Sequence, residues 1–253
     1  MLNMSVYLRR INYAGPTVPT PETLREVHRA HLFAVPFENL DIHLGRKIVC
    51  DEGSFLHKIV NERRGGFCYE LNGAFAALLR ALGFQVTLLS ARVARPDGGD
   101  SPEFDHLTLR VDIDEPWLVD VGFGDSFLEP LRLKSTLEQP QIGRIYRVHK
   151  AKDVFGLEVM ANDRWKREYS FTLQPRQLSE FADMCHYHQT SPLSHFTRKL
   201  ICSRPTPEGR ITLSDRTLIE TRNGVRQERI LSGEDELRAK LHELFGVKVP
   251  PDE

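Results

Sequence analysis

The residue best placed for covalent chemistry is Cys68, which follows a glycine pair in the run Arg64-Gly-Gly-Phe-Cys-Tyr-Glu-Leu. Apolar residues then recur at helical spacing as far as Gly83, which predicts a helix whose first turn holds Cys68. Because the free amides of a helix N-terminus stabilise an anion, we expect a lowered pKa and a nucleophilic thiolate at Cys68. The glycines would let a substrate approach backbone amides that can act as oxyanion donors. The competing interpretation is a buried core cysteine, since Leu71 and Phe75 follow on the same helical face.

A thiolate nucleophile needs a base and a group that orients the base, and His106 and Asp120 can supply both. His106 opens a predicted strand, and Asp120 interrupts the otherwise apolar segment 117–123, where a carboxylate is costly to bury unless it is paired. If residues 112–115 form a tight turn, His106 lies opposite Asp120 or Val121, and only the first register brings the two side chains together. The competing interpretations are a solvent-exposed histidine at a strand edge and a structural carboxylate bonded to loop amides.

Three other motifs carry weaker signals. The run Cys185-His-Tyr-His188 has metal-ligand residue types, but histidines two positions apart on a helix point in different directions. The run Gly122-Phe-Gly124 could cradle a phosphate or could simply be a tight turn that ends a strand. The pair Arg63-Arg64 is typical of a solvated helix end. We therefore expect no metal site.

The composition is that of an ordinary globular chain. Of 253 residues, 40% are hydrophobic and 27% charged, and the formal net charge is -1, which argues against a surface that binds nucleic acid or anionic lipid. No apolar run approaches the length of a membrane span, and the N-terminus lacks the pattern of a secretory signal. The cysteines are too widely spaced for a zinc ribbon, so we expect four thiols in a reducing cytoplasm: Cys50, Cys68, Cys185 and Cys202.

The elements that must position these residues change in type along the chain. The first third has helical periodicity and capping signals, which predict helices at 21–35, 53–63 and 68–82. The middle third has period-two alternation, which predicts a barrel or rolled sheet with strands at 85–94, 106–113, 117–123, 146–150, 156–160 and 165–172. The last third is mixed. We predict helices at 178–188 and at 233–245, the second capped by Ser232, and strands at 210–213 and 225–231. An Asn223-Gly224 hairpin turn precedes the second strand.

The run at residues 64–72 resembles the active-site segment of the arylamine N-acetyltransferases. Four further segments are similar to motifs of the same family: residues 35–43, 105–107, 120–124 and 191–196. The resemblance extends from about residue 7 to residue 245. No single segment is specific, but their combination is.

This resemblance implies an α+β fold with a cysteine-protease-like catalytic core. Its parts would be an N-terminal helical bundle over residues 1–84, a central β-barrel over residues 85–190 and a C-terminal α/β lid over residues 191–253. It also implies a ping-pong reaction by a Cys68–His106–Asp120 triad. Acetyl-CoA would acetylate Cys68, and an arylamine, an arylhydrazine or an N-hydroxyarylamine would then take the acetyl group.

The resemblance further implies which residues line the substrate site. The aromatic acceptor would lie against flat apolar walls formed by Phe37, Val93, Phe123 and Phe196. The CoA moiety would pass Gly122 and Gly124. Asp125 departs from what a phosphate-binding path favours, because its carboxylate would repel the donor's phosphates.

Three other functions fit the same residues. An amide synthase of the same family would close a macrolactam from a polyketide thioester and would not need CoA. A cysteine hydrolase, either a protease or a transglutaminase-like enzyme, would use the same three residue types. A binding or scaffold protein would keep the fold without the chemistry. The resemblance favours the acetyltransferase, which needs no nucleic acid or membrane partner.

Overall fold

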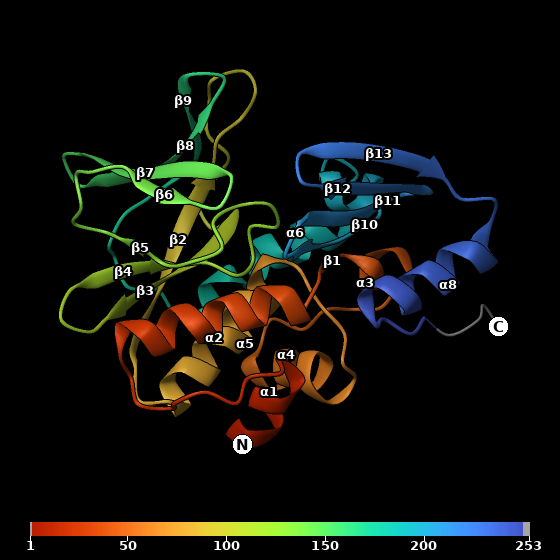
Figure 1. Cartoon of the computed structure of the whole chain (residues 1–253), viewed down its shortest axis with the longest axis horizontal. Coiled ribbons are helices and arrows are strands. Elements are labelled where there is room, and N and C mark those ends of the chain that lie inside the picture. The colour runs from red at the N-terminus through yellow and green to blue at the C-terminus, as the bar shows by residue number, and fades with distance from the viewer. Residues whose placement is uncertain (1, 250–253) are drawn as a thin grey trace.

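Helices form the N-terminal third of the chain in the computed structural model, which describes residues 2–249 (Figure 1). The Thr20 hydroxyl caps the second helix by accepting the backbone N–H of Thr23 at 3.2 Å, and Pro21 takes the first helical position. No helix within this described part is long and apolar enough to cross a membrane. The helices are α1 (Met4–Arg10), α2 (Pro21–Ala34), α3 (Leu40–His43), α4 (Glu52–Leu56) with its π-helical continuation η1 (His57–Asn61), and α5 (Cys68–Ala81).

Helix α5 begins at Cys68, as the sequence predicts, and runs through the main hydrophobic core. Its start is fixed by Glu70, whose Oε2 accepts the backbone N–H of Phe67 at 3.1 Å. Its end is followed by Gly83 in a left-handed conformation with φ +90°. All but two residues of this helix are buried, so its first turn is held from every side.

Eight antiparallel strands form a nearly closed barrel in the order β5-β4-β3-β2-β9-β8-β7-β6. Leucines and aromatic residues fill its interior, among them Leu89, Leu118, Tyr146, Leu157 and Phe171. The middle-third strands are confirmed, except that the strand predicted at 117–123 ends at residue 119 and that two short strands, β5 and β6, are additional. The strands are β2 (Gln85–Val93), β3 (His106–Asp112), β4 (Pro116–Val119), β5 (Leu131–Arg132), β6 (Gln139–Gln141), β7 (Arg144–Ala151), β8 (Val154–Ala161) and β9 (Arg164–Phe171).

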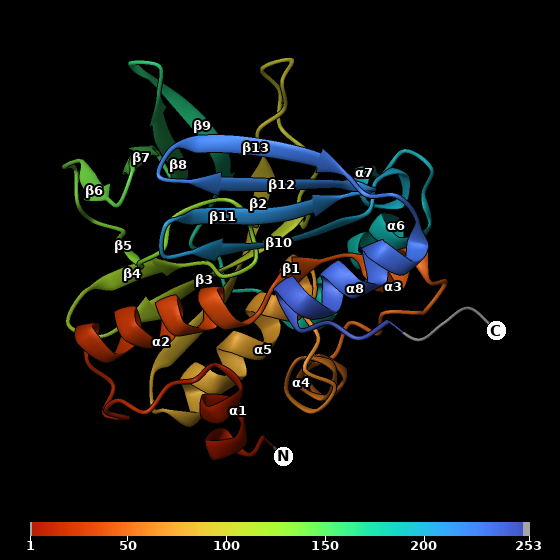
Figure 2. The ribbon, with the colours of Figure 1, turned by 45° about the vertical axis from the view of Figure 1, so that its right-hand side comes forward.

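A second sheet of five strands, in the order β1-β10-β11-β12-β13, joins the short N-terminal strand β1 to four strands of the C-terminal part of the chain (Figure 2). The Asn223-Gly224 turn between β12 and β13 is confirmed, with both residues at positive φ. The last helix is confirmed, but Gly233 rather than Ser232 is its N-cap. The remaining elements are β1 (Phe37–Glu38), β10 (Ile201–Thr206), β11 (Gly209–Ser214), β12 (Thr217–Arg222), β13 (Val225–Ile230), η2 (Leu178–Phe181), α6 (Ala182–Thr190), α7 (His195–Arg198) and α8 (Glu234–Phe245).

Strand β1 ties the loop before Cys68 to this second sheet. Phe37 pairs with Ser203 of β10 on one side and bridges Gly66 on the other, and Glu38 donates its N–H to the Gly66 carbonyl at 2.9 Å. Strand β1 therefore connects the loop before Cys68 to the edge of the C-terminal sheet. The division of the chain after residues 84 and 190 stays a prediction.

Candidate active site

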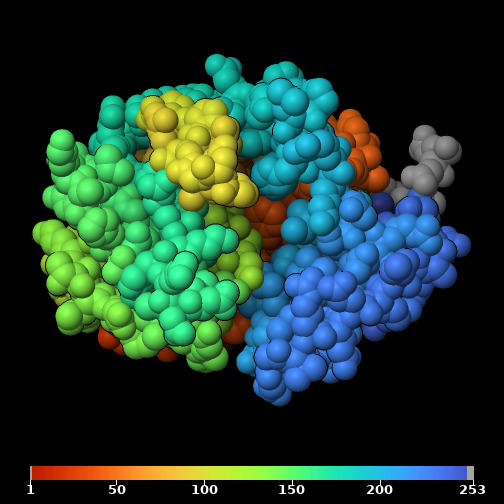
Figure 3. All heavy atoms as spheres, turned by 90° about the horizontal axis from the view of Figure 1, so that it is seen from above, coloured from red at the N-terminus to blue at the C-terminus, as the bar shows by residue number. Residues whose placement is uncertain are grey.

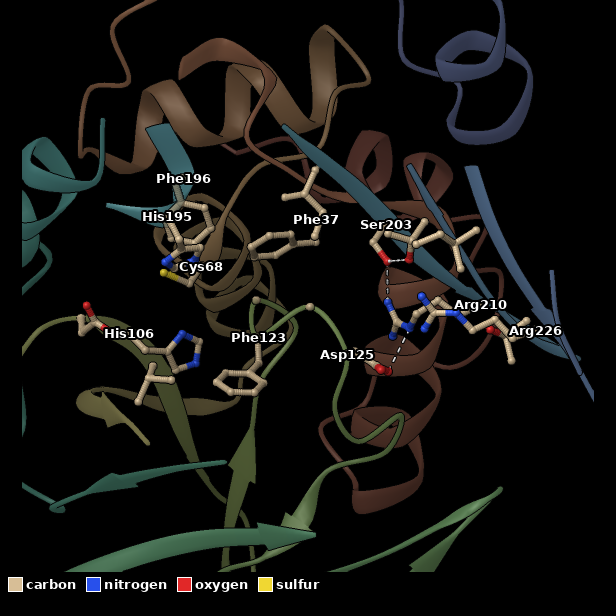
Figure 4. Close-up of a pocket in the computed structure, with 18 residues that line it drawn as sticks. Phe37, Cys68, His106, Phe123, Asp125, His195, Phe196, Ser203, Arg210 and Arg226 are labelled. Atoms are coloured by element: carbon tan, nitrogen blue, oxygen red, sulfur yellow. Dashed lines mark hydrogen bonds and ion pairs between the residues drawn. The ribbon is translucent and has the colours of Figure 1, made fainter. Parts of the chain in front are cut away.

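Cys68 lines a cavity of about 450 Å³ that lies beneath a hollow between the barrel and the C-terminal sheet (Figure 3). The cavity wall is built from distant parts of the chain: His106 opens β3, Phe123 follows β4, Phe37 lies on β1 and Phe196 on α7. Figure 4 shows the Cys68 sulfur and the His106 imidazole on the same side of this space. The fold thus places a thiol and an imidazole at one surface that a small molecule can reach.

His106 and Asp120 form a buried pair. The distance from His106 Nε2 to Asp120 Oδ2 is 2.6 Å, and the two residues are 3% and 2% exposed. The interpretation of His106 as a solvated histidine is therefore wrong, and Asp120 bonds this imidazole as well as the loop N–H of Gly122. What the sequence predicts correctly is the pairing of these two side chains.

The register predicted for this pair is wrong. Asp112 pairs with Pro116 and Leu109 with Val119, so the turn is longer than expected and Asp120 follows the last residue of β4. Continuing this register places position 120 diagonally across from His106 rather than opposite it. The side chains still meet because diagonal neighbours share one face of an antiparallel pair.

The Asp120 carboxylate accepts three further hydrogen bonds. Asn72 Nδ2 and the Gly122 N–H reach Oδ1 at 2.8 and 2.9 Å, and the Tyr169 hydroxyl reaches Oδ2 at 3.0 Å. Burial acts to raise the pKa of Asp120, but His106 and the hydrogen bonds from Asn72 and the Gly122 N–H hold it below its usual value. The carboxylate is therefore ionised and fixed in one orientation at neutral pH.

Asn72 is a site residue to which sequence reasoning gave no role. Its Nδ2 also donates to the Leu107 carbonyl at 2.6 Å, and its Oδ1 accepts the Val121 N–H at 2.9 Å. The side chain thereby joins α5 to the strands on either side of the His106–Asp120 pair. The available signal was a polar residue one helical turn after Cys68 in an otherwise apolar helix.

The pKa of the Cys68 thiol is raised, not lowered as its helix position predicts. Burial is the main cause, and the nearby carboxylates of Asp105 and Asp120 act in the same direction. Backbone hydrogen bonds at Leu107 and Tyr69 oppose the shift without cancelling it. Desolvation therefore outweighs the helix dipole here, and the resting group is a neutral thiol that needs a base to ionise.

A buried cluster of charges, comprising Lys58, Arg64, Glu38, Asp41 and Glu70, holds the loop before Cys68. Lys58 Nζ lies 2.7 Å from Asp41 and 2.8 Å from Glu70, and Arg64 Nη2 lies 2.8 Å from Glu38. Burial raises the pKa of Glu70 to about 7, against the pull of Lys58. The interpretation of Arg64 as part of a solvated helix end is wrong, because this residue is 3% exposed.

The two glycines predicted to lie along the donor path both line the cavity. Gly122 is also required for packing: a Cβ there would lie 2.8 Å from the Cα of Cys68 and 2.7 Å from Asn72 Nδ2. Gly124 adopts φ +94°, a conformation that L side chains rarely take. Gly122 therefore lets the loop after β4 approach the start of α5.

The four residues predicted to form the acceptor pocket, Phe37, Val93, Phe123 and Phe196, all line the same cavity. The Phe123 ring centroid lies 5.2 Å from that of His106 in an edge-on arrangement, and the Phe37 and Phe196 rings are 6.1 Å apart. These faces form apolar walls close to the thiol (Figure 4). They suit a flat aromatic ring.

The other end of the cavity is polar and basic. Arg210 and Arg226 line it together with hydroxyl side chains of the C-terminal sheet, away from Cys68 (Figure 4). Asp125 lies between two guanidinium groups, 2.7 Å from Arg144 Nη2 and 2.9 Å from Arg210 Nε. Its charge is thus compensated, which removes the repulsion that the sequence suggested. These arginines lie on separate strands, and nothing in the sequence groups them.

The weaker motifs have structural roles. His188 lies 3.2 Å from the Asp105 carboxylate and 3.1 Å from the Ser194 hydroxyl. Within residues 2–249, no group of three His, Cys, Asp or Glu side chains is arranged to hold a metal ion. The four cysteines are all free thiols.

Comparisons with known proteins agree with this geometry. The sequence model of the N-acetyltransferase family matches residues 20–253. An arylamine N-acetyltransferase of Escherichia coli is 36% identical over 247 residues, which cover 96% of this chain and 88% of that protein. The structure of the Salmonella typhimurium arylamine N-acetyltransferase superposes with a TM-score of 0.93 at 33% identity, covering 99% and 93% of the two chains. A Mycobacterium marinum enzyme of the same name, in complex with CoA, gives a TM-score of 0.89 at 33% identity, covering 97% and 93%.

Proposed function

The chain belongs to the arylamine N-acetyltransferase family, and from this premise we propose that it moves an acetyl group from acetyl-CoA, through a thioester on Cys68, to an aromatic amine. The acceptors would be arylamines, arylhydrazines and N-hydroxyarylamines. The observation that carries the proposal is the shared cavity. Cys68, His106 and three aromatic side chains line this one space, and Asp120 is hydrogen-bonded to His106.

In the first half-reaction, His106 takes the proton of the Cys68 thiol as the sulfur attacks the acetyl carbonyl. The carbon–sulfur bond of acetyl-CoA then breaks, and His106 returns the proton to the departing CoA thiolate. Because Asp120 binds Nε2, Nδ1 is the ring nitrogen left for this proton. Asp120 stabilises the imidazolium that forms, which compensates for the raised pKa of the buried thiol.

In the second half-reaction, the amine nitrogen attacks the thioester carbonyl. His106 accepts the proton that this nitrogen loses, the bond from carbon to Cys68 breaks, and the thiolate recovers the proton from His106. The aromatic walls hold the ring of the acceptor while its nitrogen reaches the thioester. The imidazolium that His106 becomes on taking the amine proton can protonate the departing sulfur, which offsets the raised pKa of this thiol.

The polar end of the cavity fits the phosphorylated end of the donor. The thioester must reach Cys68, and Gly122 and Gly124 line the wall next to it. Arg210 also pairs with Asp125 and Arg226 with Glu228, so the N–H groups of these two arginines outside those pairs would bind phosphate oxygens. The Mycobacterium marinum relative, whose structure contains CoA, supports a donor of this kind.

Steady-state kinetics with acetyl-CoA and aniline test the proposal. We expect parallel lines in double-reciprocal plots, loss of turnover in Cys68→Ala and full turnover in Cys50→Ala, since Cys50 does not line the cavity. Turnover retained by Cys68→Ala would overturn the mechanism. Peptide hydrolysis or macrolactam closure without acetyl transfer would instead favour a hydrolase or an amide synthase.

A further inference from the structure

One charged side chain of the cavity has no part in the proposed mechanism. Asp105 directly precedes His106 and lines the cavity at the same end as Cys68. Its carboxylate lies 3.2 Å from His188 Nε2, and its side chain keeps 16% of its surface exposed. His188 does not line the cavity, so Asp105 is the member of this pair that lies at the cavity wall.

Asp105 is charged at neutral pH. Burial acts to raise the pKa of this carboxyl, but hydrogen bonds from His188 and Ser101 and the charges of His188 and His106 hold it below its usual value. The same contacts keep the side chain from turning away from the wall. Burial is the main cause of the raised pKa of the Cys68 thiol, and the charge of Asp105 acts in the same direction.

The other carboxylates near the cavity are better compensated. Asp120 is 2% exposed and accepts hydrogen bonds from four groups, and Asp125 lies between two arginines at the opposite end. His195 lines the wall near Asp105, but burial lowers its pKa, so its imidazole is neutral at pH 7. The basic side chains Arg210 and Arg226 lie at the far end (Figure 4). Among the described residues that line the thiol end of the cavity, Asp105 is therefore an acidic side chain with no arginine or lysine beside it, and its partner His188 lies outside the lining.

We infer that Asp105 selects the acceptor by charge. It disfavours aromatic amines that carry a carboxylate near the reacting nitrogen, and it favours uncharged acceptors. This inference rests on the proposed acetyl transfer, for which it names a preferred class of acceptor.

A pair of acceptors with the same shape tests the inference. We compare kcat/KM for 3-aminobenzamide and 3-aminobenzoate, which differ in charge, in the wild-type protein and in Asp105→Asn. In a ping-pong reaction this constant reports only the acceptor half-reaction, so changes in the acetylation of Cys68 cancel. The wild type should prefer the amide, and Asp105→Asn should reduce that preference about tenfold at low salt, the scale of one unit charge at this range.

Asp112→Asn is the matched control. Asp112 lies at the other end of β3, pairs with Arg110 and does not line the cavity. Removing its charge should therefore leave unchanged the ratio of kcat/KM for the amide to kcat/KM for the acid. The wild-type ratio should also fall between ~0.05 and ~0.5 M salt, because salt screens the field. If Asp105→Asn does not fold, Asp105→Ser carries the same comparison.

The outcomes separate the inference from the proposed function. If Asp105→Asn changes both acceptors by the same factor, Asp105 only holds the wall in place and the inference is wrong. If the wild type acetylates neither these acceptors nor aniline, the proposed function fails and the inference fails with it. A ratio that shifts in Asp105→Asn and stays constant in Asp112→Asn supports the inference.

Discussion

Asn72 and Asp120 are joined by a hydrogen bond of 2.8 Å between Nδ2 and Oδ1. This bond connects the helix that begins at Cys68 with the carboxylate that holds His106. Asn72 is fully buried, and its amide also bonds the backbone at Leu107 and Val121. One side chain thus fixes the helix, the strand of the histidine and the loop of the carboxylate relative to one another.

Asn72→Ala should therefore reduce both stability and activity. It leaves the Leu107 carbonyl and the Val121 N–H without their partner and removes one donor from Asp120. We expect a loss of about 2–4 kcal/mol in the free energy of unfolding, measured with urea, and acetylation of Cys68 slowed by at least tenfold. A variant with unchanged stability would show that this amide does not join the three elements.

Gly122→Ala should disturb the same region through packing alone. Its Cβ would contact the backbone of Cys68, which cannot move aside as a flexible side chain can. We expect a destabilisation of about 1–3 kcal/mol together with slower acetylation. The matched control is Gly156→Ala in β8, where a Cβ would meet only ordinary van der Waals contacts, the nearest at 3.7 Å, so the protein should not be destabilised. Equal effects at the two positions would contradict this account.

Glu70 should make stability depend on pH. Its pKa rises from 4.5 to about 7 on folding, mainly because of burial, so the folded protein holds a proton that the unfolded chain releases between these values. The contribution of Glu70 is therefore complete below pH 4.5 and is lost as pH rises to about 7. Relative to Glu70→Gln, the wild type should lose about 1–3 kcal/mol of unfolding free energy over this interval. Urea titrations at several pH values measure it.

The control for this pH series is Glu22→Gln, at the exposed start of α2. Its free energy of unfolding should change with pH as that of the wild type does. If the wild type and Glu70→Gln instead run parallel from pH 4.5 to 7, Glu70 does not titrate in this interval.

Arg226→Gln should weaken the binding of acetyl-CoA without affecting acyl donors that lack phosphates. Arg226 lines the basic end of the cavity, where phosphates are proposed to bind. We expect KM for acetyl-CoA to rise about three- to tenfold and to depend less on salt, with p-nitrophenyl acetate unaffected because it lacks phosphates. Arg222→Gln is the control, since Arg222 has the same Arg–Glu pairing on the neighbouring strand but does not line the cavity. A proportional loss with both donors would argue against a phosphate contact.

The sequence predicts the longer helices and the long strands of the barrel because capping residues and periodicity are local signals, whereas α1, β10 and β12 were missed. Thr20 and Gly83 mark helix ends, and alternation marks the strand that begins at His106. Strand β1 is only two residues long and pairs with a strand far along the chain, so no local pattern reveals it.

Within the site, residue types were predictable and their environment was not. The pairing of His106 with Asp120 follows from the cost of burying a carboxylate, but its register depended on a turn length that the sequence leaves open. The pKa of Cys68 depends on how deeply the fold buries it, and the helix start alone predicts the wrong direction. Likewise, Arg64 is polar by sequence but lies within a charge cluster that only the packed structure assembles.

Intact-mass analysis after mixing the protein with acetyl-CoA, without an acceptor, tests the central claim most directly. We predict a single added acetyl group that maps to Cys68, is absent in Cys68→Ser and disappears when aniline is added. No adduct, or an acetyl group on another cysteine that persists in Cys68→Ser, would contradict the claim that the reaction passes through a thioester on Cys68.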